Sequence, residues 1–368
     1  MEKTPVISTG ELSKMLSMGK TVNIIDVRPL QDRQDWYIPG SIHVDAYDRL
    51  RKHDPNALDS VHLDKSVPVI TVCESGNTSL IAADMLRQQG YRAYSLLDGM
   101  RGWSLAWNYA HEQFENFEIW QVRRTGKGCL SYIIAANDEA IVIDASLPIE
   151  VYKEILTRHH FSIKSILETH IHADHLSRSR ELATFLNAPL WLPANKKVQF
   201  KFQPIDNNSI FQVGNVNIQA IPTPGHTEES YSFLIDGSIL ITGDTLFTNA
   251  IGRPDLNSST EETKEKAHLL YQSLQKLFSL PDSVIVLPAH TSIPVEFDNK
   301  MIRTTIGEAK KNIPLLKLNE NEFVNSILQK MPPTPANFLT IIEKNIKGDY
   351  GDVNVSELEL GANRCEIK

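Results

Sequence analysis

The sequence predicts two α/β domains. The first is a parallel sheet covered by helices over residues 1–110, and the second is a sandwich of sheets with helices outside over residues 118–368. A chain of 368 residues is longer than one ordinary domain. Strand and helix patterns alternate in the first part, as they do in parallel sheets. From residue 118, two strand-rich stretches are flanked by helical patterns, and the last helices form a C-terminal extension.

The elements of the first domain follow from capping signals and apolar runs. Ser8 and Glu11 form a capping box ahead of a predicted helix over 11–18. Another predicted helix ends at Gly90. Apolar, β-branched runs predict strands at residues 22–27, 67–72 and 91–97. The polar stretch 108–118 is interpreted as a connector between the domains.

The second domain is predicted to be rich in hairpins. Asn137 and Asp138 are turn residues between two apolar runs, so residues 129–145 should form a hairpin. Ser259 caps a long helix that reaches about Phe278. The remaining elements are a helix at 149–160 and strands at 165–170, 209–214, 216–222, 231–236, 238–244 and 283–290.

The C-terminal tail is expected to be helical. Pro335 follows Thr334, and proline is favoured at the first helical position, so a helix is predicted to begin there. Apolar residues then recur at helical spacing, which gives this helix one apolar face: Phe338, Ile341, Ile342 and Ile346.

Charge and composition exclude several kinds of partner. The chain has 37 basic and 45 acidic residues and no basic run, so we expect no nucleic-acid partner. No apolar run reaches the roughly 18 residues of a membrane helix, and no secretory signal is visible. Three cysteines without a C-x-x-C pair favour a reducing, cytoplasmic setting. Homo-oligomer formation stays open.

A cluster of metal-binding side chains occupies residues 168–177. His170, His172, Asp174 and His175 fall within six positions, at the end of a predicted strand. Residues two apart on an extended segment face the same way, so His170 and His172 can point into one site. Three further candidates also stand at strand ends: His226, Asp244 and His290. Imidazole and carboxylate are ligands of borderline divalent metals, so the pattern predicts a metal site.

The cluster matches the H-x-H-x-D-H motif of the metallo-β-lactamase superfamily, which residues 118–300 resemble. The resemblance implies an αββα sandwich with the site at one edge. Two branches carry all seven residues. Glyoxalase-II-like thioesterases use them to hold two zinc ions, whereas persulfide dioxygenases hold one Fe(II). The dioxygenase resemblance implies His170, His226 and Asp244 as ligands, with the rest orienting them from outside: His172, Asp174, His175 and His290.

The segment after Asp244 favours the dioxygenase branch. Gly252-Arg253-Pro254-Asp255 is similar to a motif of persulfide dioxygenases, and the C-terminal sequences MPPTPANF and GANRCE also resemble that group. The resemblance implies that Arg253 and Asp255 bind substrate. The alternative is that Arg253 is a salt-bridged loop residue. Cys129 is expected in the core and Cys365 in the tail.

Cys73 is the candidate nucleophile of the first domain. It lies between a strand and a helix, where backbone N–H groups lower the pKa of a thiol and bind anions. Together with Asp26-Val27-Arg28 and Asp98-Gly99-Met100-Arg101-Gly102-Trp103, this loop resembles the rhodanese family. The resemblance implies that Cys73 carries sulfane sulfur. Glu74 and Thr78 replace the usual arginines, so we expect weak transfer from thiosulfate.

The two resemblances together predict an enzyme of sulfide metabolism. Iron would support oxidation of a low-molecular-weight thiol persulfide, such as glutathione persulfide, by O2 to sulfite and free thiol. The cofactor would be one Fe(II) per chain, and Cys73 would exchange sulfur with substrate or product. The alternative is a dizinc glyoxalase-II-like thioesterase with a non-catalytic rhodanese-like binding module.

Overall fold

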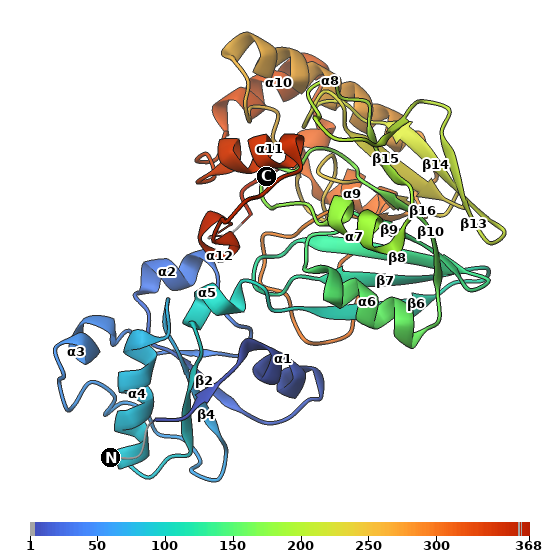
Figure 1. The fold of residues 1–368 in the computed structure, drawn as a ribbon. Helices are drawn as coiled ribbons and strands as arrows, with labels where there is room; N and C mark the ends of the chain where they lie inside the picture. Colours follow the sequence, from blue (N-terminus) through green and yellow to red (C-terminus); the bar gives the residue numbers. More distant parts are fainter. Residues whose placement is uncertain (1–3, 360, 362) are drawn as a thin grey trace.

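The computed structural model describes residues 4–359, 361 and 363–368 (Figure 1). Its first domain contains a five-stranded parallel sheet in the order β1-β5-β4-β2-β3. The strands are β1 (Val6–Ile7), β2 (Asn23–Asp26), β3 (Ile42–His43), β4 (Val69–Val72) and β5 (Ala93–Leu96). The helices are α1 (Thr9–Ser17), α2 (Leu30–Asp35), α3 (Tyr47–Arg51), α4 (Asn77–Gln88) and α5 (Gly99–Trp103). The predicted parallel sheet is confirmed.

Both faces of this sheet are covered, which explains why its central strands are almost entirely apolar. On one face Ile25 and Val69 pack with Leu86 of α4. On the other face Ile24 and Ile70 belong to a second apolar cluster. The capping box at the start of α1 is confirmed, because Ser8 Oγ accepts from the Glu11 backbone and the Glu11 carboxylate accepts from the Ser8 backbone.

The second domain is a sandwich of two sheets. A seven-stranded sheet has the order β12-β11-β10-β9-β8-β7-β6, and a six-stranded sheet has the order β13-β14-β15-β16-β18-β19. The first contains β6 (Asn108–Gln113), β7 (Glu118–Arg123), β8 (Leu130–Ala136), β9 (Glu139–Ile143), β10 (Ser162–Leu167), β11 (Leu190–Pro193) and β12 (Gln203–Ile205). The second contains β13 (Ile210–Val213), β14 (Val216–Pro222), β15 (Tyr231–Ile235), β16 (Ile239–Ile241), β18 (Ile285–Leu287) and β19 (Thr304–Thr305).

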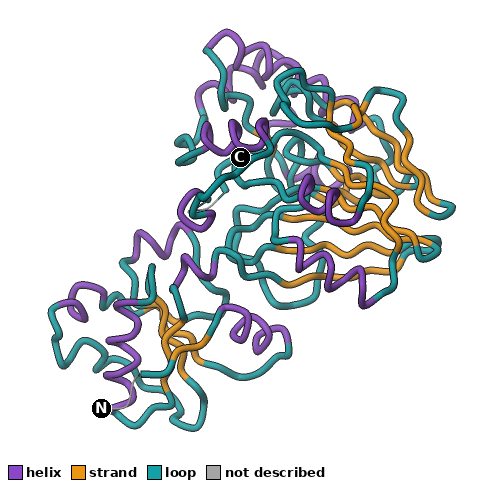
Figure 2. The backbone as a smooth tube through the Cα atoms, in the orientation of Figure 1, coloured by secondary structure: helices purple, strands orange, loops and turns teal. Residues whose placement is uncertain are grey.

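Apolar side chains from the two sheets fill the space between them. Ile134 and Ile143 of the first sheet share one cluster with Ile218, Phe233 and Ile241 of the second. Helices α6 (Ile149–Arg158) and α7 (Ser179–Leu186) cover the outside of the first sheet, and α8 (Thr260–Phe278), α9 (Ile306–Asn312) and α10 (Glu320–Gln329) cover the second. Figure 2 shows the same layers by secondary structure. The predicted αββα sandwich is confirmed.

Two local predictions are wrong. The stretch interpreted as a connector contains β6, the edge strand that pairs antiparallel with β7. Its polar residues are tolerated because one side of an edge strand faces solvent. The tail helix α11 (Phe338–Lys347) begins three residues after Pro335. The carbonyls of Pro332 and Pro333 accept hydrogen bonds from Arg253, which ties the preceding segment down outside the helix.

The C-terminal segment returns to the body of the second domain. After α12 (Val355–Leu358), the chain reaches β20 (Glu366–Ile367), which pairs with β17 (Ile251–Gly252). Glu359 is buried and forms a 2.6 Å ion pair with the buried Arg124. Among the described residues, no helix combines the length and apolar character needed to cross a membrane.

The two domains contact each other through specific polar bonds. Trp36 Nε1 donates to the Thr125 carbonyl at 3.0 Å, and Arg124 Nε donates to the Ser104 carbonyl at 2.7 Å. At Gly126, a Cβ atom would lie 1.9 Å from the Trp103 carbonyl oxygen, so only glycine permits this approach. Figure 1 shows α2, α5 and α12 gathered where the domains meet.

Candidate metal centre

All seven motif residues lie at one edge of the sandwich and are nearly inaccessible. The loop with the four-residue cluster follows β10, whose neighbours in the sheet are β9 and β11. His226 follows β14, Asp244 follows β16 and His290 follows β18. The most exposed of the seven, Asp174, is only 6% accessible. Adjacent strand ends therefore bring together residues that are far apart in sequence.

Three of the seven residues form a compact set of candidate ligands. His170, His226 and Asp244 offer ligand atoms within 4.8 Å of one another. Asp244 Oδ2 lies 3.9 Å from His170 Nε2 and 3.5 Å from His226 Nε2. His170 Nε2 and Asp244 Oδ1 are buried without a hydrogen-bond partner among the described residues. Unpaired buried polar atoms are costly, so this donor set fits a bound metal ion.

Hydrogen bonds to the other ring nitrogen orient both histidines. His226 Nδ1 lies 2.7 Å from the Arg253 carbonyl, so it donates there and leaves Nε2 free. His170 Nδ1 lies 2.9 Å from Thr169 Oγ1, and that hydroxyl donates to Asp144 at 2.8 Å. Metal-binding histidines are commonly fixed in this way. Burial lowers the pKa of His170 and of His226, which keeps both imidazoles neutral.

His172 points to a different set of partners. Its Nε2 lies 2.7 Å from Glu168 Oε2 and 3.3 Å from Asp144 Oδ1. Burial alone would lower the pKa of His172, but the two carboxylates hold it well above its usual value. Sequence reasoning missed both carboxylates. Asp144 follows β9 and Glu168 follows β10, so the same strand-end argument would have found them.

Asp174 and His175 pair with each other. His175 Nδ1 lies 2.9 Å from Asp174 Oδ1, and Cys129 Sγ lies 3.4 Å from the other oxygen. Against the opposing effect of burial, Asp174 raises the pKa of His175 to about 9. Asn345 of α11 donates to the carbonyls of His172 and His175 at 2.9 and 2.8 Å. The tail helix therefore holds the loop, a role that its apolar pattern does not reveal.

His290 is the last of the seven motif residues, and it contacts Asp244. Its Nε2 lies 3.0 Å from Asp244 Oδ2, and its Nδ1 lies 3.7 Å from Glu366. Cys365, expected only to be a tail residue, is fully buried in a cluster with Asp244 and His290. Burial raises the pKa of the Cys365 thiol to about 12. The C-terminal strand therefore forms one side of the site.

Arg253 is fully buried and uses all of its donors within the protein. It donates two bonds to Asp255, of 2.7 and 2.8 Å, and the others to the carbonyls of Pro332, Pro333 and Arg364. An arginine has five N–H groups, and these five bonds occupy them. A direct substrate contact by Arg253 is therefore not supported, and Asp255 serves as its partner. Both residues position the tail and, through the Arg253 carbonyl, His226.

Cys73 lies at the beginning of α4, as the sequence predicted. Its Sγ accepts from the Ser79 backbone N–H at 3.3 Å and lies 3.3 Å from Ser79 Oγ. Gly99 packs against this loop so closely that a Cβ atom there would lie 2.2 Å from the Cys73 carbonyl oxygen. The thiol is only 1% accessible. The loop is thus tightly held, with Cys73 Sγ pointing at the Ser79 backbone N–H.

Glu74 is partly buried between two arginines. Arg28 Nη1 and Arg101 Nε each lie 3.8 Å from its carboxylate oxygens. Burial raises the pKa of Glu74, and the two arginines oppose that rise. The sequence comparison suggested a loop without arginine. Two arginines do reach it from other elements, but Arg28 is paired more closely with Asp26 and Arg101 with Glu357. Thr78 is buried in the first turn of α4.

Comparison with known proteins identifies both domains. Residues 8–106 match the rhodanese-like domain, and residues 124–290 match the metallo-beta-lactamase superfamily. A hydroxyacylglutathione hydrolase from Prochlorococcus marinus is 33% identical over 189 residues, which cover 49% of this chain and 70% of that protein. The chain belongs to the metallo-beta-lactamase superfamily. It is a superfamily metalloenzyme whose buried histidine and aspartate clusters are typical of metal binding in this fold.

Solved structures of the superfamily share this fold. A metallo-beta-lactamase from Staphylococcus aureus subsp. aureus COL is 26% identical with a TM-score of 0.58, covering 66% of this chain and 74% of that one. ETHE1 from Myxococcus xanthus is also 26% identical, with a TM-score of 0.54, covering 61% of this chain and 96% of that one. The superfamily fold in this chain is therefore joined to an N-terminal rhodanese-like domain.

Proposed function

We propose that the chain is a persulfide dioxygenase with one Fe(II), held by His170, His226 and Asp244. The supporting observation is the division of the seven motif residues. His170, His226 and Asp244 converge, and His170 Nε2 and Asp244 Oδ1 have no hydrogen-bond partner among the described residues. His172 Nε2 is also without a hydrogen bond there, but it lies 2.7 Å from the Glu168 carboxylate, and His175 pairs with Asp174. Two histidines and one carboxylate with open positions are the donor set of non-haem Fe(II) oxygenases.

The overall reaction converts a thiol persulfide, O2 and water into the free thiol and sulfite. Iron, when bound, would supply the activation of O2 beside the terminal sulfur. The protein's own groups hold the reacting partners. The Arg253 carbonyl and Thr169 fix the two imidazoles, and Asp244 contributes negative charge that offsets the charge of the metal. Each of the seven motif residues is at most 6% accessible, so the site is largely shielded from bulk solvent.

Cys73 has a separate role in this proposal. The hydrogen bond from the Ser79 backbone N–H, in the first turn of α4, would stabilise a thiolate or an anionic persulfide. We assign it the transfer of sulfane sulfur to or from a small thiol. Arg28 is paired with Asp26 and Arg101 with Glu357, and Glu74 adds a further negative charge beside both, so the dianion thiosulfate should be a poor donor.

A second candidate is the hydrolysis of a glutathione thioester by two zinc ions. It is favoured by the 33% identity to a hydroxyacylglutathione hydrolase. The first candidate acts on a persulfide of a small thiol and the second on a thioester of one. The name of that relative therefore also supports glutathione as the thiol that carries the reacting group. The contacts of His172 with Glu168 and of His175 with Asp174 favour the single-iron proposal.

Two assays on one preparation separate these candidates. Oxygen uptake and sulfite formation are measured with glutathione persulfide, and thiol release is measured with S-lactoylglutathione under nitrogen. We expect oxygen uptake and sulfite in equal amounts, with negligible thioester hydrolysis. Rapid thioester hydrolysis without oxygen uptake would overturn the proposal and support the dizinc enzyme.

A further inference from the structure

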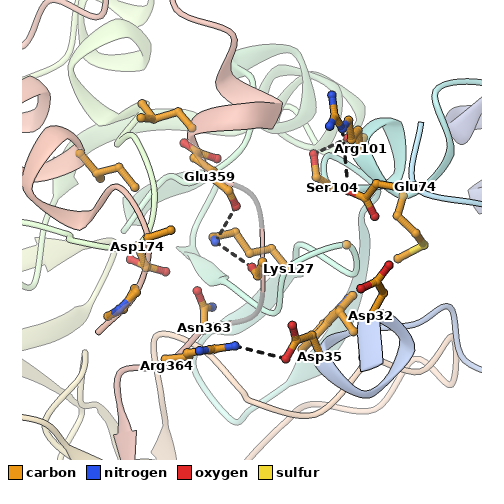
Figure 3. A pocket seen from close by; sticks show the side chains of 18 of the residues that line it. Asp32, Asp35, Glu74, Arg101, Ser104, Lys127, Asp174, Glu359, Asn363 and Arg364 are labelled. Atoms are coloured by element: carbon orange, nitrogen blue, oxygen red, sulfur yellow. Dashed lines mark hydrogen bonds and ion pairs between the residues drawn. The ribbon is translucent and has the colours of Figure 1, made fainter. Parts of the chain in front are cut away.

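A cavity of about 560 Å³ lies between the two domains. Its volume is within the usual range for sites that bind small molecules. Figure 3 shows labelled residues of both domains around it, with Glu74 and Asp32 on one side and Asp174 and Glu359 on the other. Because both domains line this cavity, it is distinct from the metal cluster and from the Cys73 loop, which each belong to one domain.

The wall from the rhodanese-like domain begins next to the sulfur-carrying cysteine. Glu74, the residue after Cys73, lines the cavity together with Met100 and Arg101. The backbone N–H groups of Met100 and Arg101 donate to the carbonyls of Cys73 and Glu74 at 2.8 and 3.0 Å. The cavity wall and the Cys73 loop are therefore one connected structure.

The opposite wall includes the metal-site loop. Ala173 and Asp174, from the histidine cluster, line the same cavity. Asn363 lines it as well, and its side chain is only 3% accessible. Asn363 Oδ1 has no hydrogen-bond partner among the described residues. A buried amide oxygen without a partner is unfavourable, so this atom is available to accept a hydrogen bond from a ligand or from water.

The charges on the walls are mixed and mostly paired. Arg364 lies 3.2 Å from Asp35 across the domain boundary, and Arg101 pairs with Glu74 and Glu357. The Lys127 ammonium donates to the carbonyls of Glu359 and Gly361. A ligand with both ammonium and carboxylate groups can form ion pairs with both kinds of wall charge, in place of the pairs that the wall residues form with each other. A polyphosphate would meet too many carboxylates, because like charges repel strongly at short range.

Cys73 and the three proposed metal ligands do not line the cavity, but Glu74, the residue after Cys73, and the loop that follows His172 do. We propose that this cavity, hereafter the interdomain chamber, binds an amino-acid or peptide thiol and passes its persulfide from the Cys73 loop to the metal-site loop. The proposal rests on the proposed dioxygenase function. A bound thiolate attacks the outer sulfur of a Cys73 persulfide. The new S–S bond forms on the small thiol, the bond to Cys73 Sγ breaks, and its electron pair stays on Sγ. No net oxidation occurs. The resulting small-molecule persulfide then reaches the metal centre without release into solution.

A mixing experiment tests this transfer. Full-length protein is loaded anaerobically with sulfane sulfur at Cys73 by treatment with polysulfide, desalted, checked by intact mass, and mixed with glutathione in aerated buffer. The comparison is an equimolar mixture of loaded Asp244→Asn protein and Cys73→Ser protein, so that the two sites lie on different chains. Sulfite formation should be at least about tenfold faster in wild type at low micromolar concentration, because transfer within one molecule has a high effective concentration.

Dilution decides between transfer within the chamber and release. If the sulfur is transferred within the chamber, the rate of sulfite formation per wild-type molecule stays constant on dilution, while the rate for the mixture falls. Equal rates for the two samples, falling together, would overturn the proposal. Free glutathione persulfide is given to the same proteins as a separate reference. If the protein takes up oxygen with free glutathione persulfide but the two samples of the mixing experiment react at equal rates, the chamber is refuted and the proposed function stands. If the protein takes up no oxygen with free glutathione persulfide, the proposed function is refuted.

A matched pair of variants tests the chamber itself. Ala336 lines it, and Leu339, three residues later, is 54% exposed and does not line it. Ala336→Trp should raise KM for glutathione persulfide about tenfold or more and slow sulfite formation from loaded protein, while Leu339→Trp should change neither. Coenzyme A should replace glutathione poorly as acceptor. Identical behaviour of the two tryptophan variants, or preference for coenzyme A, would contradict the assigned site and thiol class.

Discussion

The seven motif residues fall into two groups that differ in what their polar atoms contact. His170, His226 and Asp244 face one another and leave buried atoms unpaired, as a metal site requires. The other four have protein partners: His172 lies against Glu168, and Asp174 and His175 pair together, although His172 Nε2 and His175 Nε2 also form no hydrogen bond among the described residues. His290 bridges the groups through its 3.0 Å contact with Asp244. One-metal and two-metal enzymes share this motif. In this chain, neighbouring carboxylates pair with some of the motif residues and leave the others to bind metal.

The largest effect is expected from removing the carboxylate of the converging group. Asp244→Asn should lose the metal and reduce oxygen uptake by roughly 10³-fold, because metal stabilisation contributes several kcal/mol. Asp174→Asn is the matched control, and it should retain its metal. Metal content and oxygen uptake of the two purified variants check this. If both variants lost metal equally, the division into two groups would be wrong.

His172→Gln should have a smaller effect. It removes a partner of Glu168 and Asp144, and changes next to metal ligands typically reduce activity about 10–100-fold. Metal content should be the same as in wild type, since His172 is outside the converging group. Elemental analysis of the variant provides the test. Loss of half of the bound metal would identify His172 as a ligand of one of two ions.

Glu359→Gln should destabilise the wall of the site without touching the metal. Glu359 is paired with the fully buried Arg124 and accepts from the Leu176 backbone at 2.6 Å. Breaking a buried ion pair costs about 3 kcal/mol or more, and the melting temperature should fall by roughly 6–12 °C. Glu357→Gln is the control, because its pair with Arg101 is exposed. Calorimetry should show almost no change in that variant.

Glu74→Gln should improve the use of thiosulfate. The change removes one negative charge that lies 3.8 Å from both Arg28 and Arg101, although Arg28 stays paired with Asp26 and Arg101 with Glu357. We expect about a tenfold higher rate of sulfur transfer, or about 1.4 kcal/mol. Burial raises the pKa of Glu74, so its charge is lost as the pH falls through that value, and the advantage of the variant should shrink at lower pH. Steady-state kinetics across pH, with Asp84→Asn on α4 as control, test this.

Cys73→Ser should have the smallest effect on oxidation of free persulfide. Cys73 belongs to the first domain and is absent from the metal cluster, so oxygen uptake on supplied glutathione persulfide should stay within about twofold, a difference of less than 0.5 kcal/mol. Sulfur loading, measured by intact mass, should be abolished. Loss of oxygen uptake on the free substrate would mean that Cys73 is required in every turnover.

Local signals predicted much of the fold. The capping boxes at Ser8 and Ser259 and the apolar strands are short-range features, and the structure reproduces them. The strand β6 was missed because an edge strand tolerates polar residues, and the start of α11 was misplaced because Arg253 ties the prolines down from far away in the sequence. Long-range contacts of this kind leave no local pattern.

Strand positions predicted which residues belong to the candidate site, whereas their grouping was implied only by the family resemblance. Strand-end placement located all seven motif residues, because neighbouring strand ends meet at one edge. Their division depends on Asp144, Glu168 and Asn345, whose side chains contact the motif only after the fold forms. The sequence likewise placed Arg253 near the site but could not show that all five donors are already used.

Metal stoichiometry tests the central claim most directly. Protein purified under nitrogen, without added metal, is analysed for iron and zinc by mass spectrometry against its chain concentration. The division of the motif predicts one iron per chain, held by His170, His226 and Asp244. Two zinc ions per chain, with His172 and His175 required for their retention, would contradict it.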